Sequence, residues 1–451
     1  MKKLVILIVL FMMSGSFDSC PACANNFWFS RENQKQTTIV IEAFEVEPLG
    51  IAGGEISADT ATSDAESTDE TADPPDQIVS SWNYWYEVSG EAMFVKKSVL
   101  LSNGDVMLFG ANTKGDAFSI DRLTPSGARV CSRINYGNEP SFSVKTASAL
   151  FGKVFVAGEY SFQLADGTIQ SDIMLFSISE NCDVMGVSGF DYHGLEHPVV
   201  ILQRGTQLLI VGLSRQNGHY TPFYLETDNT GSNPVMRETG LADTIVHDVI
   251  IHDGNTLYSV GSRLLGTDVH HAWIAGLTLE GDLVWEKVLP VTGFNSYAYR
   301  IILRDSGLII AGGQTEYLTD GTTVGSIFLE RTSLTGELFV MSPSMVSANV
   351  SEIISDMVGG DQGPVYIISR LSQPGQYSQA RVMSFDPTTL IPMDEVVVKS
   401  NGVHTSLGDA IIMDDAGVLM SGSQYDGGGR SRGQVIKTDS DLLFPENPTS
   451  M

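Results

Sequence analysis

A short pattern recurs along most of this chain: a polar turn, an apolar run and a glycine. DSGLIIAGG begins at Asp305, and similar segments begin at Ser102 (SNGDVMLFG), His252 (HDGNTLYSVG) and Asp414 (DDAGVLMSG). The glycines recur about every 52 residues, a period at which each repeat forms one supersecondary unit that packs on its neighbours. This period therefore constrains the fold more than any other feature. The marker positions are Gly110, Gly158, Gly212, Gly261, Gly312, Ser369 and Gly422.

Each copy contains apolar runs separated by turn residues, which predicts short antiparallel strands. In the fifth copy, YRIIL from Tyr299 precedes the turn and LIIAG follows it. The turn Asp305-Ser306-Gly307 supplies a residue with positive φ. A continuous run such as LIIA is typical of a strand buried on both faces. We expect the final glycine to end this strand, where a longer loop begins.

Four short strands per copy predict one blade of a β-propeller, and seven copies span residues 78–451. The sequence thus predicts an all-β, seven-bladed β-propeller of four-stranded antiparallel blades. The last copy lacks a fourth strand, but WNYWYEVSG (Trp82–Gly90) precedes the first copy, and its WYEV matches VWEKV from Val284. We therefore expect an N-terminal strand to complete the last blade and close the ring.

The repeats DAIIMDDAGVLMSG with GQVIKTDSD, and HDVIIHDGNTLYSVG with WIAGLTLEGDLVWEKVL, carry a family pattern. They resemble bacterial exported β-propeller repeat proteins, whose repeats read D-A-x-S-V, D-G-G-Y-I-V-A-G, L-x-K-L-D-x-x-G and W-x-K. The copy with GGDQGPVYIIS departs most, because it carries an insertion and lacks the marker glycine. The resemblance implies the propeller fold and export, and it implies no particular activity.

The first residues have the features of an export signal. Lys2 and Lys3 precede the apolar run LVILIVLFMM, which at about ten residues is too short to span a bilayer. Residues 1–24 are therefore predicted to be a signal peptide. Ala22-Cys23-Ala24 fits cleavage that releases a soluble protein, whereas Cys20 fits a lipoprotein cysteine, and the sequence leaves both open. We expect a periplasmic, cell-surface or extracellular protein, with membrane contact only through such an anchor.

Composition changes sharply after the leader. Residues 25–52 form a segment of unclear structure, and residues 53–77 are predicted to be a disordered acidic linker. Eleven acidic residues and no Lys or Arg lie between Glu42 and Asp76, and the whole chain has a formal net charge of −28. This charge excludes nucleic acid as a partner and favours a soluble monomer.

Cys131 and Cys182 remain in either mature form of the protein. A disulfide between them is one expectation for an exported chain, and two separate buried thiols are the other. No motif for a nucleotide, a metal protease or a nucleophilic serine is found, so no cofactor is expected.

Unequal loops give the main functional clue. The connections between the second and third strands, and between blades, are long and carry aromatic and basic residues, and they share one face. Binding groups concentrate on long loops held by a rigid scaffold. We expect a protein, peptide or glycan ligand on this long-loop face, although Tyr and Arg are also ordinary loop residues. The candidate ligand-binding residues are Arg215, Tyr220, Arg263, His271, Tyr317, Arg370, Tyr377 and Tyr425.

Three histidines form a candidate metal site. His197 and His247 precede innermost strands at matching places in adjacent blades, and His193 lies four residues before His197. A zinc or iron site needs three or four such ligands at fixed distances. The alternative is that they are separate solvated histidines.

The resulting hypothesis is a non-catalytic binding or scaffolding propeller at the cell envelope or outside the cell. The alternative is a hydrolase or lyase that acts on a polymer through His or Asp residues at the central funnel, and a purely structural envelope component is a third option. The sequence leaves catalysis open and favours binding.

Overall fold

The computed structural model describes residues 81–442 apart from residues 89–90, 113–116, 137–140, 164–166, 168, 193, 217–218, 266–268, 292–294, 318–322, 343–349, 361, 399–402, 427–430 and 441. The predicted leader (1–24), the segment 25–52, the acidic linker (53–77) and the candidate residues Cys20 and His193 lie outside the described residues.

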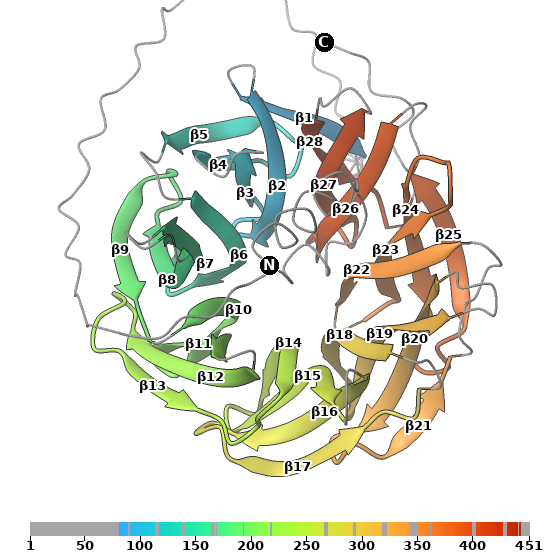
Figure 1. The fold of residues 1–451 in the computed structure, drawn as a ribbon. Helices are drawn as coiled ribbons and strands as arrows, with labels where there is room; N and C mark the ends of the chain where they lie inside the picture. Colours follow the sequence, from blue (N-terminus) through green and yellow to red (C-terminus); the bar gives the residue numbers. More distant parts are fainter. Residues whose placement is uncertain are drawn as a thin grey trace, which may run out of the picture.

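The regular elements of the described residues are β-strands, and consecutive strands pair antiparallel in groups of four. The groups stand around a common centre, and each group has its first strand innermost (Figure 1). The inner strands are β2 (Glu91–Leu100), β6 (Ser141–Leu150), β10 (Leu195–Arg204), β14 (Thr244–His252), β18 (Asn295–Arg304), β22 (Ser351–Gly359) and β26 (Val403–Ile412).

The other strands follow outward from the centre in chain order. The second strands are β3 (Val106–Asn112), β7 (Lys153–Gln163), β11 (Gln207–Gln216), β15 (Thr256–Leu264), β19 (Gly307–Tyr317), β23 (Val365–Ser372) and β27 (Val418–Asp426). The third strands are β4 (Ala117–Leu123), β8 (Ile169–Ile178), β12 (His219–Asp228), β16 (His270–Thr278), β20 (Thr323–Ser333), β24 (Gln379–Phe385) and β28 (Ser431–Lys437). The outer strands are β5 (Arg129–Tyr136), β9 (Val184–Phe190), β13 (Val235–Glu238), β17 (Leu283–Val288), β21 (Leu338–Met341) and β25 (Pro392–Val398).

The outer place in the group of β26, β27 and β28 is taken by β1 (Trp82–Val88), from the start of the described chain. Trp82 lies opposite Lys437, and Tyr86 lies opposite Gly433. Tyr86 is fully buried, and its hydroxyl donates a hydrogen bond to Asp121 of the next group. Segments from the two ends of the described chain thus form one sheet.

Apolar clusters lie between neighbouring groups. Phe109 and Ile120 pack with Val154 and Val156 of the following group, and the other clusters are shared in the same way. The second strands are therefore buried on both faces. In the segment DSGLIIAGG, Ile309 belongs to the cluster with β22 and β23, whereas Ile310 belongs to the cluster with β15 and β16. This explains the continuous apolar runs of the sequence.

Every inner strand has a β-bulge opposite the marker position. Gly212 pairs with Pro198, and the next pair is Val211 with Val200. A Cβ on Gly212 would lie 2.8 Å from the carbonyl oxygen of His197, so a side chain does not fit there. The expectation that the marker glycine ends its strand is wrong, because β11 continues to Gln216. The bulged residues are Lys96, Lys145, Val199, His247, Tyr299, Ser355 and Gly408.

A disulfide joins Cys131 on β5 to Cys182 in the turn after β8, with 6.1 Å between the two Cα atoms. It connects the outer strand of one group to the neighbouring group. Cys182 is 1% exposed, and the φ of 65° at Cys182 places it in the left-handed region.

Candidate ligand-binding cavity

A cavity of about 1180 Å³ lies among the inner strands, with residues from each of them in its wall. The adjoining wall comes from the C-terminal ends of second strands and the N-terminal ends of third strands, for example Arg215 on β11 and Tyr220 on β12. These strand ends lead into the connections of the predicted long-loop face. The cavity therefore occupies the end of the central space on that face. It is larger than the 300–1,000 Å³ common for small-ligand sites.

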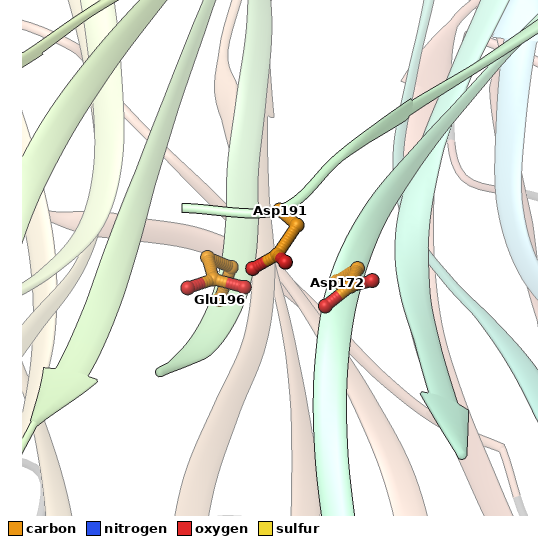
Figure 2. A group of neighbouring side chains, drawn as sticks. All are labelled: Asp172, Asp191 and Glu196. Atoms are coloured by element: carbon orange, nitrogen blue, oxygen red, sulfur yellow. The ribbon is translucent and has the colours of Figure 1, made fainter. Parts of the chain in front are cut away.

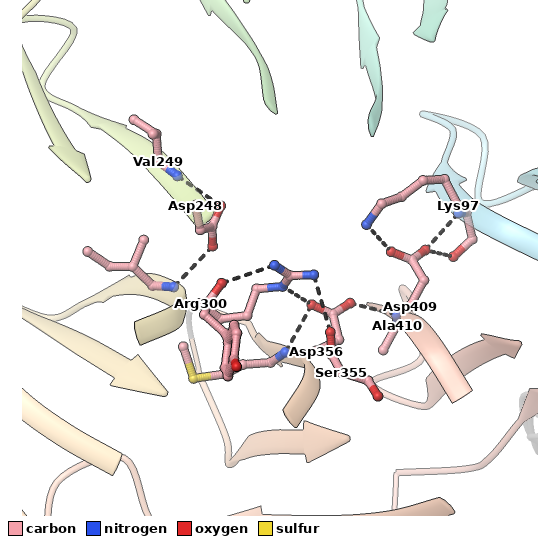
Figure 3. A network of polar contacts seen from close by, with 12 residues as sticks. Lys97, Asp248, Val249, Arg300, Ser355, Asp356, Asp409 and Ala410 are labelled. Carbon is pink, nitrogen blue, oxygen red and sulfur yellow. Dashed lines mark hydrogen bonds and ion pairs between the residues drawn. The ribbon is translucent and has the colours of Figure 1, made fainter. Parts of the chain in front are cut away.

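Charged residues that directly follow the bulges form a network at the cavity, which we call the polar belt (Figure 3). Lys97 donates to Asp409 over 2.6 Å, and Arg300 donates to Asp356 over 2.6 Å. The aspartates also accept hydrogen bonds from backbone N–H groups of the next inner strand. The belt thus links the inner strands β14, β18, β22, β26 and β2 in succession. Its members are Lys97, Asp248, Arg300, Asp356 and Asp409.

Backbone contacts of the belt follow one rule. Asp409 accepts from the N–H of Ser98 over 2.7 Å, and Asp356 accepts from the N–H of Ala410 over 2.8 Å. Asp248 accepts from the N–H of Ile301 over 3.0 Å. In each case, the N–H donor on the next inner strand comes one residue after the position that matches the aspartate when the two strands are aligned on their bulges. The aspartate of the D-A repeat therefore fastens its group to the next one.

Burial and neighbouring charges shift the pKa values of the belt. Burial raises the pKa of Asp248 to about 6, although Arg300 and the N–H of Ile301 act in the opposite direction. Burial disfavours the charged form of Arg300, but Asp356 and Asp248 raise its pKa above the usual value. Burial likewise disfavours the charged form of Lys97, but Asp409 and Asp356 together raise its pKa above the usual value.

Four aromatic side chains of β14, β16 and β18 form a continuous row in the cavity wall. The ring of His247 lies 5.1 Å from that of Tyr299, and Tyr299 is stacked with Tyr297 at 5.9 Å. Tyr297 is also stacked with His270 at 5.4 Å. Burial, together with Arg300 and the other two histidines nearby, lowers the pKa of His247 to about 3. Its imidazole is therefore neutral near pH 7.

A second set of polar residues lies on the wall formed by β6, β7 and β10. Glu159 accepts from Lys145 over 3.1 Å and contacts Nδ1 of His197. Burial alone would raise the pKa of Glu159, but the bonds to His197 and Lys145 lower it to about 2. Glu159 therefore stays ionised and fixes the orientation of the His197 ring.

The predicted ligand-binding residues have different surroundings. Arg215, Tyr220 and Arg370 line the cavity. Arg263 instead pairs with Glu286 at 2.5 Å, and His271 lies opposite Arg263 in the β15–β16 ladder.

Tyr377 and Tyr425 lie outside the cavity wall. Tyr377 and Tyr425 gather around His404, with ring distances of 5.0 and 6.2 Å, and are 46% and 43% exposed. Tyr317 is the last residue of β19. The two exposed tyrosines thus belong to a surface group apart from the cavity.

The predicted metal ligands His197 and His247 both line the cavity, but they have different surroundings. Nδ1 of His197 is occupied by Glu159, and His247 is part of the aromatic row. Within the described residues, neither belongs to a set of three ligand atoms that lie within 4.8 Å of one another. A metal site at these histidines stays a prediction.

Sequence reasoning missed Lys145, Glu159, Tyr297 and Tyr299. A signal for two of them was present, because Lys145 and Tyr299 occupy the bulge position that His247 occupies in another copy. Alignment of the copies on the marker glycine would have brought these residues together with His247.

Three carboxylates gather where Leu195 of β10 pairs with Ser171 of β8. Asp172, Asp191 and Glu196 have oxygen atoms within 4.8 Å of one another (Figure 2). Burial and the charge of Asp191 raise the pKa of Asp172 to about 6. Carboxylate oxygens are ligands for Ca²⁺, but three acidic groups alone do not indicate a bound cation.

Among the described residues, no helix is long and apolar enough to cross a membrane.

No protein-family model matches the sequence, and no curated protein is significantly similar to it. An ancestral GH74 enzyme matches 81% of this chain at 8% identity and a TM-score of 0.49, and this chain spans only 52% of that enzyme. The phage phi92 endosialidase matches 82% of this chain and 70% of its own length, at 11% identity and a TM-score of 0.45. An ulvan lyase of polysaccharide lyase family PL25 matches 68% of this chain and 82% of its own length, at 12% identity and a TM-score of 0.45. Such TM-scores carry no conclusion about activity.

Proposed function

We propose that this chain is a closed, seven-bladed β-propeller that binds a saccharide in its central cavity without cleaving it. The pairing of β1 with β28, and the contacts of β26 with β2, support closure of the ring. The observation that carries the binding function is the aromatic row of His247, Tyr299, Tyr297 and His270 in the wall of one large cavity.

A saccharide fits this wall chemically. A pyranose ring has apolar faces, which pack against aromatic rings, and a polar edge of hydroxyl groups, which need hydrogen-bond partners. Hydroxyl and amide side chains in the same wall can serve as those partners. They include Ser161, Asn295, Gln314, Thr315, Ser351 and Ser372.

Binding without cleavage is favoured by the state of the cavity carboxylates. Glu159 is held by His197 and Lys145, and Asp356 and Asp409 are held within the polar belt. A general acid or base must reach the proton that it transfers. Carboxylates already engaged by two or more protein groups are poorly placed for that task.

The alternative is a hydrolase or lyase that acts on a polymer at His247 and Asp248. One observation favours it: the pKa of Asp248 is raised to about 6, a value suited to proton transfer near neutral pH. Against it, Asp248 accepts hydrogen bonds from the N–H groups of Val249 and Ile301.

We further propose that the protein is exported and works at the cell envelope or outside the cell. Residues 1–24 are the leader, and residues 53–77 are a spacer that holds the propeller away from its point of attachment. Acylation at Cys20 would make it a surface lipoprotein, and cleavage after Ala24 would release it. Mass spectrometry of the mature N-terminus distinguishes the two forms.

Calorimetric titration of the full chain with pyranose hexasaccharides tests the binding function. Tyr299→Ala removes one ring of the row, and we expect the Kd to rise about tenfold, since stacking on one ring is worth about 1–3 kcal/mol. Tyr377→Ala is the matched control, because Tyr377 is exposed outside the cavity. An equal loss in both variants, or no saccharide binding at all, contradicts the proposal.

Product analysis decides between binding and cleavage. Incubation of the full chain with the same hexasaccharides should yield no shorter or unsaturated products. Products that disappear in Asp248→Asn and His247→Ala would establish the enzymatic alternative instead.

A further inference from the structure

Arg215 lies at the C-terminal end of β11 and lines the cavity. Its guanidinium group lies over the ring of Tyr220, with 5.2 Å between the guanidinium carbon and the ring centroid. Nη1 of Arg215 is buried and has no hydrogen-bond partner among the described residues. Leaving such a donor unsatisfied costs free energy, so this position calls for a further partner.

Three other cations of the cavity wall have carboxylate partners. Lys97 pairs with Asp409, Arg300 pairs with Asp356, and Lys145 pairs with Glu159, at 2.6, 2.6 and 3.1 Å. The chain has 54 acidic and 26 basic residues, so carboxylates are abundant. Within the described residues, Arg215 nevertheless has no ion pair. The counter-charge at Arg215 is thus left for a bound molecule.

Within the described residues, Lys96 on the inner strand β2 also has no ion pair. Lys96 and Lys145 occupy equivalent bulge positions on β2 and β6. Burial and repulsion from Lys145 lower the pKa of Lys96, whose aliphatic chain places the ammonium 5.3 Å from the ring of Phe94. An anion bound near this wall would relieve that repulsion. Lys96 and Arg215 therefore favour negative charge in a ligand near this wall.

The geometry points to an anionic saccharide, and we propose that Arg215, supported by Tyr220, binds its carboxylate or sulfate group. This rests on the saccharide binding proposed above. A guanidinium offers two parallel N–H donors that match a carboxylate or sulfate, and stacking on Tyr220 holds the fork in one orientation. The aromatic row then contacts the sugar face, while Arg215 selects the acidic substituent.

Nucleic acid is a poor candidate for the same anionic chemistry. A polyanion must approach a protein of net charge −28, and long-range repulsion opposes that approach. A short oligosaccharide with one or a few acidic groups experiences less of this repulsion and can enter the cavity.

The test is calorimetric titration of the full chain with three hexasaccharides: an oligogalacturonate, a sulfated galactan and a neutral galactan. We expect at least one of the two acidic sugars to bind about tenfold more tightly than the neutral sugar, and which of them binds identifies the source of the charge. In Arg215→Gln this preference should disappear, and in Arg215→Lys it should be partly retained. Arg237→Gln, on the exposed outer strand β13 of the same group, is the matched control and should keep the full preference.

Four outcomes overturn the inference. Equal affinity for neutral and acidic sugars leaves the proposed saccharide function standing but removes the role of Arg215, and so does an acidic preference that survives in Arg215→Gln. If the protein binds a hexaglutamate peptide but none of the sugars, the ligand is an acidic peptide and not a saccharide. Failure of all three sugars removes the saccharide function itself. Circular dichroism melting of each variant shows whether a lost preference reflects unfolding.

Discussion

Two parts of the cavity wall differ at the same structural position. Directly after the bulge, the strands β14, β18, β22, β26 and β2 carry charged residues, whereas β6 and β10 carry Thr146 and Val200. The bulge itself is present in every inner strand. The charged positions are Asp248, Arg300, Asp356, Asp409 and Lys97.

The difference separates structural from binding roles. On the belt side, the charges are used by one another and by the backbone of the next inner strand. On the side of β6 and β10, Lys145, His197 and Arg215 line the cavity, and Thr146 and Val200 leave the inner strands without ionic links at that level. Charge is thus used for cohesion on the belt side, whereas on the other side the charge of Arg215 is available to a ligand.

The largest expected effect is that of Asp356→Ala. This change leaves the guanidinium of Arg300 and the N–H of Ala410 without their acceptor, in a part-buried position. Breaking a buried ion pair from one side should lower the free energy of unfolding by about 4 kcal/mol. Urea unfolding followed by circular dichroism measures the change.

The control for this prediction is Thr146→Val, at the equivalent position on β6. We expect a change below about 1 kcal/mol, since no ion pair is lost. Similar losses in the two variants would remove the distinction between the two sides.

The disulfide should compensate for the missing belt. It crosses the junction between the groups of β2–β5 and β6–β9, where Thr146 provides no ionic link between the inner strands. Replacing both Cys131 and Cys182 by Ser should lower the free energy of unfolding by about 3 kcal/mol, because the bond closes a long loop of the unfolded chain. Thermal melting with and without reductant measures this, and the double variant should not respond to reductant. If reductant left the melting temperature of the wild-type protein unchanged, the compensating role would be contradicted.

The two sides should also respond oppositely to pH. Asp248 has a pKa of about 6, above its unfolded value of 3.8, so its contribution to stability is lost as pH rises from about 4 to 6. Glu159 has a pKa of about 2, below its unfolded value of 4.5, so its contribution is lost as pH falls from about 4.5 to 2.

Isosteric amides test this contrast. At pH 7, Asp248→Asn should stabilise the protein and Glu159→Gln should destabilise it, each by about 1–2 kcal/mol after allowance for solvent screening. Urea unfolding at a series of pH values gives both slopes. If the contributions of Asp248 and Glu159 to the free energy of unfolding changed with pH in the same direction, the predicted contrast between the two carboxylates would be contradicted.

The smallest effect is expected at the carboxylate group of Asp172, Asp191 and Glu196. Asp172 has a pKa of about 6, raised first by burial and then by Asp191, so stability falls as pH rises through 6. Asp191→Asn should lower that pKa and raise the free energy of unfolding at pH 7 by less than about 1 kcal/mol. NMR titration of Asp172 follows the pKa directly, and an unchanged value would mean that burial alone sets it.

The four-stranded groups, their turns and the doubly buried second strands could be predicted from the repeat, because those features depend on local turn chemistry and on apolar runs. The role of the marker glycine could not be predicted, because a side chain there is excluded by a backbone carbonyl of another strand. At Gly212, this is the carbonyl of His197.

The cavity was predicted only in part. His197, His247 and Arg215 were found because their residue types suggested chemistry. The belt was missed because Arg300 and Asp356 are 56 residues apart and meet only through packing of adjacent groups.

The pairing of Trp82 with Lys437 has a consequence for the synthesis of each protein molecule. At about 5–20 residues per second, a ribosome needs roughly 20–70 s to travel from the first of these residues to the last. Throughout that interval Trp82, Tyr84 and Tyr86 have been synthesised but their partner strand has not. Two nascent chains that emerge from neighbouring ribosomes could then exchange these strands. The β1 strand of each chain would complete the last four-stranded group of the other. Refolding at low protein concentration should give monomers, whereas refolding at high protein concentration should give strand-exchanged dimers.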